Sequence, residues 1–314
     1  PEDLDALPDG RHVLVSEYGD LNGEIPGTLA LLDLETDARI VAFDGATDLE
    51  PVWGDPACPG APGAVFSPHG LHVSQRPDGV WQALVVNHGG RESIEFFEIA
   101  DGPELAWRGC VVAPERSLLN DVVATPEGGF LTTQMMPKRK GLGPLFAYLG
   151  AKWFDRGAHV WSWDPSTGFA IVAGTEGGLA NGLALADDGR TLFVAYSLSG
   201  ELRRVDRTTG EIEDYVMMDP IDNLTWTGDG WLVAATALAE PSIMRKCVGL
   251  EEGTCPGAHA IVAVEPTTLE QHTVYVGGPG TPGGAGTTGL VLDDGTLLIG
   301  TFAGDRIVRV SSAW

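Results

Sequence analysis

The feature that most constrains the fold is a unit that recurs six times along the chain. In each copy an acidic residue and a glycine precede an apolar stretch, and Asp-Gly between such stretches is a hairpin signal. The turn glycines lie 69, 49, 61, 41 and 65 residues apart, at Gly10, Gly79, Gly128, Gly189, Gly230 and Gly295. Repeats of about 40–50 residues with several strands each are typical of β-propeller blades.

Composition supports the same architecture. The 314 residues include 43 Gly and 21 Pro, and a compact chain so rich in turn formers is usually all-β. We therefore predict an all-β fold, a six-bladed β-propeller in which residues 1–314 form one domain. The longer intervals between repeats are then loop insertions within that domain.

The charge balance limits the partners. There are 44 acidic and 19 basic residues, a formal net charge of -25. Such a chain is repelled by nucleic-acid backbones and anionic membrane surfaces, and it attracts cations. No apolar run reaches about 18 residues, so we expect no membrane span. We expect a small-molecule partner and no nucleic acid, and the sequence leaves the oligomeric state open.

A ring of polar residues is predicted at one mouth of the central channel. The first strand of each propeller blade lines the axis, so its starting residue lies at a mouth. Counting eight residues back from each turn glycine gives Glu2, Leu71, Asn120, Asn181, Asp222 and Thr287. In the second blade the polar residue, His69, lies two positions earlier. A single Asn or Asp there is ordinarily a turn residue, but the recurrence at one register favours a ring.

The donor chemistry of this ring suits calcium. Carboxylate and carboxamide oxygens are ligands that Ca²⁺ prefers, whereas zinc favours His and Cys. Neighbouring residues of a strand point in opposite directions, so adjacent polar pairs could serve two ions stacked along the axis. The pairs are Glu2-Asp3, Asn120-Asp121 and Asp222-Asn223, with Asp3 and Asp121 the natural ligands of the deeper ion.

Two histidines are candidates for proton transfer. His69 lies in SPHGLHV and His88 in LVVNHGG. A histidine beside a metal-binding mouth could act as a general base on water, because its pKa lies near neutrality. The alternative for either residue is a packing or surface role.

The four cysteines show no zinc-binding spacing. Cys247 and Cys255 bracket a polar, glycine-containing segment and could close a local disulfide. Cys58 with Cys110 is a second pairing. The alternative is four free thiols in a cytosolic protein.

Seven segments resemble, in order, the calcium-dependent paraoxonase/arylesterase lactonases, over nearly the whole chain. They are PEDLDALPDG, FSPHGLHV, LVVNHGGRESIEFFE, SLLNDVVATPEGGFLTT, LANGLALADDGRTLFVAYS, DPIDNLTWTGDGWLVA and GTTGLVLDDGTLLIGT. The segment NGLALADDGRTLFVA alone would equally suit the gluconolactonase relatives. The combination of H-G-L with V-N-H indicates the paraoxonase branch.

The resemblance implies specific roles. It implies a catalytic calcium held by Glu2, Asn120, Asn181, Asp222 and Asn223, and a structural calcium held by Asp3, Asp121 and the backbone carbonyl of Leu71. His69 would activate water and His88 would orient it or relay its proton. Asp222 is a competing candidate for the base or nucleophile.

An amphipathic helix is predicted in the third blade. Apolar residues recur at a spacing near 3.6 through residues 142–156, which is typical of a helix with one apolar face. The family carries an active-site lid there, so the resemblance implies a lid insertion at about 135–158. Its apolar wall would include Met135, Phe146, Leu149 and Trp153. The alternative is a helix packed on the rim.

The sequence also departs from the family. It lacks the family's terminal disulfide, and the segments TTQMMPK and ATALAEPSIMRK lack histidines often found there. We expect a calcium-dependent hydrolase that opens apolar lactones, with arylesterase or weak phosphotriesterase activity at most secondary. The alternatives are a sugar lactonase of gluconolactonase type and a non-catalytic propeller scaffold. Two calcium sites and a disulfide favour a periplasmic or extracellular location over the cytoplasm.

Overall fold

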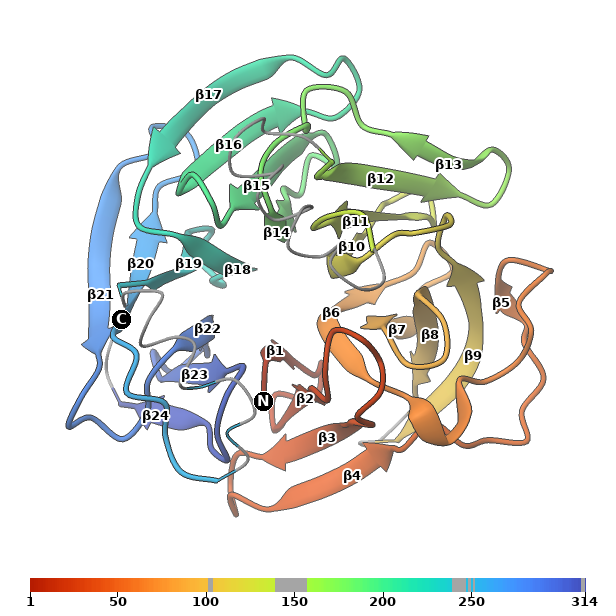
Figure 1. The fold of residues 1–314 in the computed structure, drawn as a ribbon, viewed down its shortest axis with the longest axis horizontal. Helices are drawn as coiled ribbons and strands as arrows, with labels where there is room; N and C mark the ends of the chain where they lie inside the picture. The colour runs from red at the N-terminus through yellow and green to blue at the C-terminus, as the bar shows by residue number, and fades with distance from the viewer. Residues whose placement is uncertain (101–103, 139–156, 239–246, 248–249, 251, 312–313) are drawn as a thin grey trace.

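The computed structural model is a six-bladed β-propeller, as predicted (Figure 1). It describes the whole chain except residues 101–103, 139–156, 239–246, 248–249, 251 and 312–313. The blades surround a central axis, and helix is almost absent from the described residues, which contain one 3₁₀ turn at Gly63–Val65. The helix predicted at 142–156 lies outside the described residues. In the described part of the chain, no helix has both the length and the apolar character that a membrane span requires.

The first three blades follow the chain from the axis outward. Blade 1 contains β1 (Asp3–Ala6), β2 (His12–Glu17), β3 (Thr28–Asp33) and β4 (Arg39–Phe43). Blade 2 contains β6 (Pro68–Gln75), β7 (Trp81–Asn87), β8 (Ser93–Ile99) and β9 (Leu105–Val112), with a short parallel strand β5 (Trp53–Gly54) beside β9. Blade 3 contains β10 (Leu119–Ala124), β11 (Phe130–Gln134), β12 (His159–Asp164) and β13 (Gly168–Ile171).

The last three blades complete the ring. Blade 4 contains β14 (Ala180–Leu185), β15 (Thr191–Tyr196), β16 (Glu201–Asp206) and β17 (Ile212–Met217). Blade 5 contains β18 (Ile221–Trp226), β19 (Leu232–Ala237), β20 (His259–Val264) and β21 (Gln271–Gly277). Blade 6 contains β22 (Gly286–Val291), β23 (Leu297–Thr301) and β24 (Val308–Val310).

Each recurring Asp-Gly or Glu-Gly pair forms the turn between the first and second strands of a blade. The six turn glycines have φ between 65° and 89°, the left-handed region that favours glycine. Around Gly10 and Gly230 an added Cβ would have no neighbour within 4 Å. Backbone conformation, not lack of space, therefore selects glycine there and produces the repeat in the sequence.

Blades 1 and 6 close the ring by packing and by hydrogen bonds near the axis. One buried cluster joins Leu4 and Val15 of blade 1 to Leu290 and Leu298 of blade 6. The Thr301 N–H donates to the Pro1 carbonyl at 2.6 Å. Burial of each such leucine stabilises the fold by about 1.5–3 kcal/mol. Among the described strands none of blade 6 pairs edge to edge with one of blade 1, so this packing completes the ring.

Both disulfide pairings that the sequence offers are formed, Cys58–Cys110 and Cys247–Cys255. The first ties the loop before blade 2 to strand β9, across 52 residues of chain. A crosslink of this kind typically contributes about 2–4 kcal/mol by restricting the unfolded chain. The alternative of four free thiols is wrong.

Candidate functional site

A β-bulge interrupts the innermost strand of blades 2 to 6 at one common place. In β10 the chain advances from Leu119 to Val122 while its partner advances only from Gln134 to Thr132. The same register shift occurs in β6, β14, β18 and β22. A bulge bends its strand and redirects the side chains within it. The bulged positions hold His69, Asn120, Asn181, Asp222 and Thr287, and in blade 1 Glu2 directly precedes β1.

In blade 2 the bulge falls at His69, the polar residue that lies two positions before Leu71, the residue reached by counting from the turn. Strand β6 has 8 residues whereas β10 has 6, so a count of eight residues back from the turn stops two positions short of the bulge. Leu71 follows the bulge, at the place that Leu183 occupies in β14.

Four residues of the predicted upper calcium site carry a buried oxygen without a hydrogen-bond partner. These atoms are Glu2 Oε2, Asn120 Oδ1, Asn181 Oδ1 and Asn223 Oδ1. A buried polar atom left unpaired costs about 1–3 kcal/mol, and such atoms are rare in folded proteins. Here they come from four different blades, three of them at the axial bulges and Glu2 directly before β1. This is the arrangement that a shared cation would satisfy.

Glu2 connects three blades at the centre of this group. Its Oε1 accepts a hydrogen bond from Asn223 Nδ2 at 2.9 Å and lies 3.4 Å from His69 Nε2. Glu2 is 2% exposed. Burial would raise its pKa, but the positive charge of His69 and hydrogen bonds from His69 and Asn223 hold the pKa below its usual value. Glu2 therefore brings a fixed negative charge to the mouth of the channel.

Asp222 has a different environment although it lies in the same ring. Burial, followed by repulsion from Glu2, raises its pKa to about 7. A bound cation would offset both effects, because it would replace lost hydration and screen the repulsion. Asp222 thus fits the role of a ligand, and it also fits a group that exchanges protons near neutral pH.

Asp3 and Asp121 form a deeper acidic pair. Asp3 Oδ2 accepts from the Leu71 N–H at 2.9 Å, and Asp121 Oδ2 accepts from the Leu183 N–H at 2.7 Å. Each carboxylate therefore also joins its own blade to the next one. Burial and then like charge, from Glu2 at Asp3 and from Asp3 at Asp121, raise both pKa values well above normal. A cavity of about 210 Å³ is lined by both carboxylates together with Asp5 and His72.

The donor set decides which metal would fit. Within the described part of the chain, no three or more His, Cys, Asp or Glu side chains group together as metal ligands. A site on the axis must therefore rely on the unpaired carboxamide oxygens as well as on carboxylates. Such hard oxygen donors suit Ca²⁺ and do not suit zinc.

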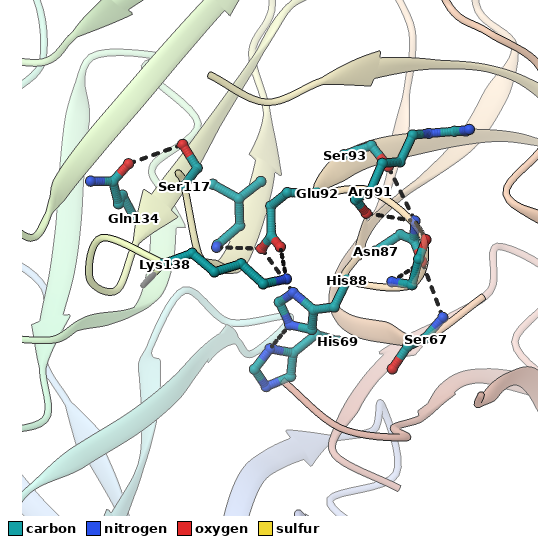
Figure 2. Close-up of polar contacts among 12 residues, drawn as sticks. Ser67, His69, Asn87, His88, Arg91, Glu92, Ser93, Ser117, Gln134 and Lys138 are labelled. Atoms are coloured by element: carbon teal, nitrogen blue, oxygen red, sulfur yellow. Dashed lines mark hydrogen bonds and ion pairs between the residues drawn. The ribbon is translucent and has the colours of Figure 1, made fainter. Parts of the chain in front are cut away.

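The two candidate histidines are in direct contact (Figure 2). His69 Nδ1 lies 2.9 Å from His88 Nε2, and both residues are buried. Burial lowers the pKa of both imidazoles; the negative charge of Glu2 outweighs this at His69, whose pKa is raised, whereas the pKa of His88 stays lowered. The structure thus brings together the histidine pair that the sequence singled out, beside the carboxylate of Glu2.

Two charged residues that the sequence analysis missed lie behind His88. Glu92 Oε1 is 2.8 Å from His88 Nδ1, and Glu92 Oε2 is 3.1 Å from Lys138 Nζ (Figure 2). Glu92 follows His88 by four residues in NHGGRE, which is the one signal that could have identified it. Lys138 comes from the segment that follows β11 in blade 3, 46 residues from Glu92, so sequence proximity could not reveal it.

Asn87, the middle residue of V-N-H, has a structural role next to His88. Its Oδ1 accepts from the Ser67 N–H at 3.0 Å and from the Gly89 N–H at 3.0 Å. Asn87 is fully buried. It thereby fixes the loop that carries His88 to the segment that precedes His69.

Most of the predicted lid, residues 139–156, lies outside the described residues. Met135 directly follows β11, and its N–H donates to the Leu118 carbonyl at 2.8 Å. Phe146, Leu149 and Trp153 lie outside the described residues, so their contribution to a substrate pocket stays a prediction.

Comparison with known proteins identifies the fold. No family model and no curated protein matches this chain. Among solved structures, a luciferin-regenerating enzyme matches with a TM-score of 0.55 and 12% identity over 99% of this chain and 90% of that one. A candidate gluconolactonase matches with a TM-score of 0.54 and 12% identity, over 96% of this chain and 85% of that one. A candidate 6-phosphogluconolactonase from Bacteroides uniformis matches with a TM-score of 0.51 and 17% identity, over 98% of this chain and 80% of that one. At these identities the likeness establishes a shared propeller fold.

Proposed function

We propose that this chain is a calcium-dependent hydrolase that opens lactone rings. The observation that carries the proposal is the set of four buried, unpartnered oxygens, contributed by four blades beside His69. A general base next to a cluster of hard oxygen donors is the arrangement required for metal-assisted hydrolysis. The names of the propeller neighbours, a candidate gluconolactonase and a candidate 6-phosphogluconolactonase, support a lactonase-like activity.

The ligands divide into an upper and a lower set. The upper, catalytic ion would be held by Glu2, Asn120, Asn181, Asp222 and Asn223. The lower, structural ion would be held by Asp3, Asp121 and the backbone carbonyl of Leu71. When bound, the upper ion would polarise the carbonyl oxygen of a lactone as a Lewis acid.

Side chains of the protein would carry out the proton transfer from water. His69 takes a proton from water as the water oxygen forms a bond to the carbonyl carbon. The ring C–O bond then breaks, and its oxygen receives that proton to give the hydroxy acid. His88, 2.9 Å from His69 Nδ1, orients the imidazole. Asp222, which lies in the same ring as Glu2, is the alternative base.

We further propose apolar lactones as the preferred substrates, with arylesterase or weak phosphotriesterase activity as a side reaction. The support is the resemblance to the paraoxonase branch and the His69–His88 pair. Sugar lactones are the second candidate, favoured by the names of the two gluconolactonase-like neighbours. The two disulfides support a periplasmic or extracellular location, where such crosslinks persist.

A pH-stat assay of a lactone panel tests this function. The panel contains short and long γ- and δ-lactones, acyl-homoserine lactones, gluconolactone, phenyl acetate and paraoxon, each with EDTA and with added Ca²⁺. Turnover of apolar lactones that EDTA abolishes and Ca²⁺ restores would support the proposal. Preference for gluconolactone would favour the sugar lactonase. If the calcium-loaded protein hydrolyses no member of the panel, the non-catalytic scaffold is the interpretation that remains.

A further inference from the structure

The charged pair behind the histidines suggests how the imidazoles are oriented. We propose that Glu92, held in place by Lys138, is a positioning residue that fixes the tautomers of His88 and His69. The structural part of this inference is independent of the reaction, whereas its catalytic consequence rests on the proposed function. Neither residue lies among the candidate metal ligands.

The first step concerns the state of Glu92. Its Oε2 lies 3.1 Å from Lys138 Nζ, and its Oε1 accepts from the Leu119 N–H at 2.7 Å. Burial would raise the pKa of Glu92, but the hydrogen bonds from His88 Nδ1 and the Leu119 N–H and the positive charge of Lys138 hold it below its usual value. Glu92 is therefore ionised, and an ionised carboxylate can only accept hydrogen bonds.

The second step follows the proton along the contacts (Figure 2). Because Glu92 Oε1 only accepts, His88 Nδ1 at 2.8 Å must donate and carries the proton. A neutral His88 then has a lone pair on Nε2, which accepts from His69 Nδ1 at 2.9 Å. Nδ1 of His69 is thus a donor whether the ring is neutral or cationic, so Nε2 is the nitrogen that exchanges a proton. That nitrogen lies on the side of Glu2 and the ring of ligands.

The third step shows why Glu92 has a fixed position. Its carbonyl oxygen accepts from the Ala113 N–H at 2.9 Å, within blade 2. The Lys138 N–H donates to the Arg116 carbonyl at 2.6 Å, which anchors the lysine beyond β11 of blade 3. Two blades thus hold the charged pair against His88. Without Glu92, the same two imidazoles could reverse their hydrogen bond, with His88 Nε2 donating to His69 Nδ1.

Long-range ¹H–¹⁵N correlation NMR on ¹⁵N-histidine-labelled protein tests the tautomers without any substrate. We expect the proton on Nδ1 of both His88 and His69 in the wild-type protein. Glu92→Met removes the acceptor at similar size, so His88 should shift to the Nε2–H form. Glu92→Gln keeps an acceptor oxygen and should restore the wild-type tautomer. Glu98→Met, in the same blade but paired with Arg108, should change neither histidine.

Two results would overturn the inference. One is an Nε2–H tautomer of His88 in the wild-type protein, which is measurable even where Glu92→Met does not fold. The other is an unchanged Nδ1–H tautomer in folded Glu92→Met.

Steady-state kinetics separate this inference from the proposed function. Loss of a group that orients a catalytic histidine typically costs about 10- to 100-fold in activity. We expect that loss in kcat for Glu92→Met, with KM nearly unchanged and Glu92→Gln close to wild type. A wild-type protein with the expected tautomers and no lactone turnover contradicts the function alone. Full turnover by a Glu92→Met protein with shifted tautomers contradicts the catalytic role of Glu92.

Discussion

Asn223 donates its side-chain N–H to Glu2 Oε1 at 2.9 Å, although the two residues are 221 positions apart in the chain. The contact joins blade 5 to blade 1 across the site. It can form only when the propeller ring has closed. The candidate calcium site is therefore a product of closure, and binding at the site should stabilise the closed ring.

The first prediction follows from this linkage. Calcium should raise the melting temperature by several degrees, because an ion that binds only the folded protein adds about 2.7 kcal/mol at 100 times its Kd. Differential scanning calorimetry of the protein in EDTA and in excess Ca²⁺ measures the shift. Mg²⁺, which accommodates this many protein oxygens poorly, is the matched control. Equal melting temperatures in EDTA and in Ca²⁺ would contradict an axial calcium site.

The sequence could predict the propeller because each blade repeats a local signal. A turn glycine with positive φ and the alternation of apolar and polar residues along a strand both depend on residues that are close in the sequence. The ring of polar residues followed from the same repeat. In blade 2 the count reaches Leu71, two positions after the polar residue His69, because β6, with 8 residues, is longer than the other inner strands.

Other parts of the site depend on contacts between distant segments. Glu92 meets Lys138 across a separation of 46 residues, and no spacing rule relates them. The unpaired oxygen of Asn223 likewise becomes notable only when burial is known. Residue type and register could single out the candidate ligands, whereas the contact of Glu92 and Lys138 with each other and with His88 required the fold.

The second prediction concerns the charge of the upper site. Asn181 presents an unpaired, neutral oxygen to the axis. Asn181→Asp should retain calcium but lower kcat about tenfold or more, because an additional carboxylate neutralises part of the cation's charge and weakens its pull on the substrate. Atomic emission measures bound calcium and the pH-stat measures turnover. Asn22→Asp, at an exposed position, is the control. Unchanged turnover with the ion retained would argue against the proposed role of the upper ion.

The third prediction separates the two calcium ions. Asp121 is buried, and its pKa is raised by burial and by the charge of Asp3. Asp121→Asn should remove the lower ion and leave the upper one, since the carboxamide supplies less negative charge to balance a divalent cation. Calcium per chain, measured by atomic emission after dialysis, should fall from about two ions to about one. The exposed Asp48→Asn variant should keep both. If Asp121→Asn binds as much calcium as Asp48→Asn, the lower site does not use Asp121.

The fourth prediction concerns the close approach of blades 4 and 5 beside the ring. A Cβ on Gly182 would lie 2.6 Å from the Asp222 carbonyl oxygen and 2.7 Å from the Leu224 nitrogen. Gly182→Ala must therefore push β14 away from β18, and overpacking of this kind costs about 1–3 kcal/mol. The shift also separates Asn181 from Asp222, so calcium affinity should fall together with stability.

In Gly228→Ala the new Cβ has an ordinary contact of 3.5 Å, and this variant controls for loss of a glycine. Isothermal titration with Ca²⁺ and urea unfolding measure the two effects. A Gly182→Ala protein that unfolds more easily but binds Ca²⁺ with wild-type affinity would show that the spacing of blades 4 and 5 does not set the geometry of the site.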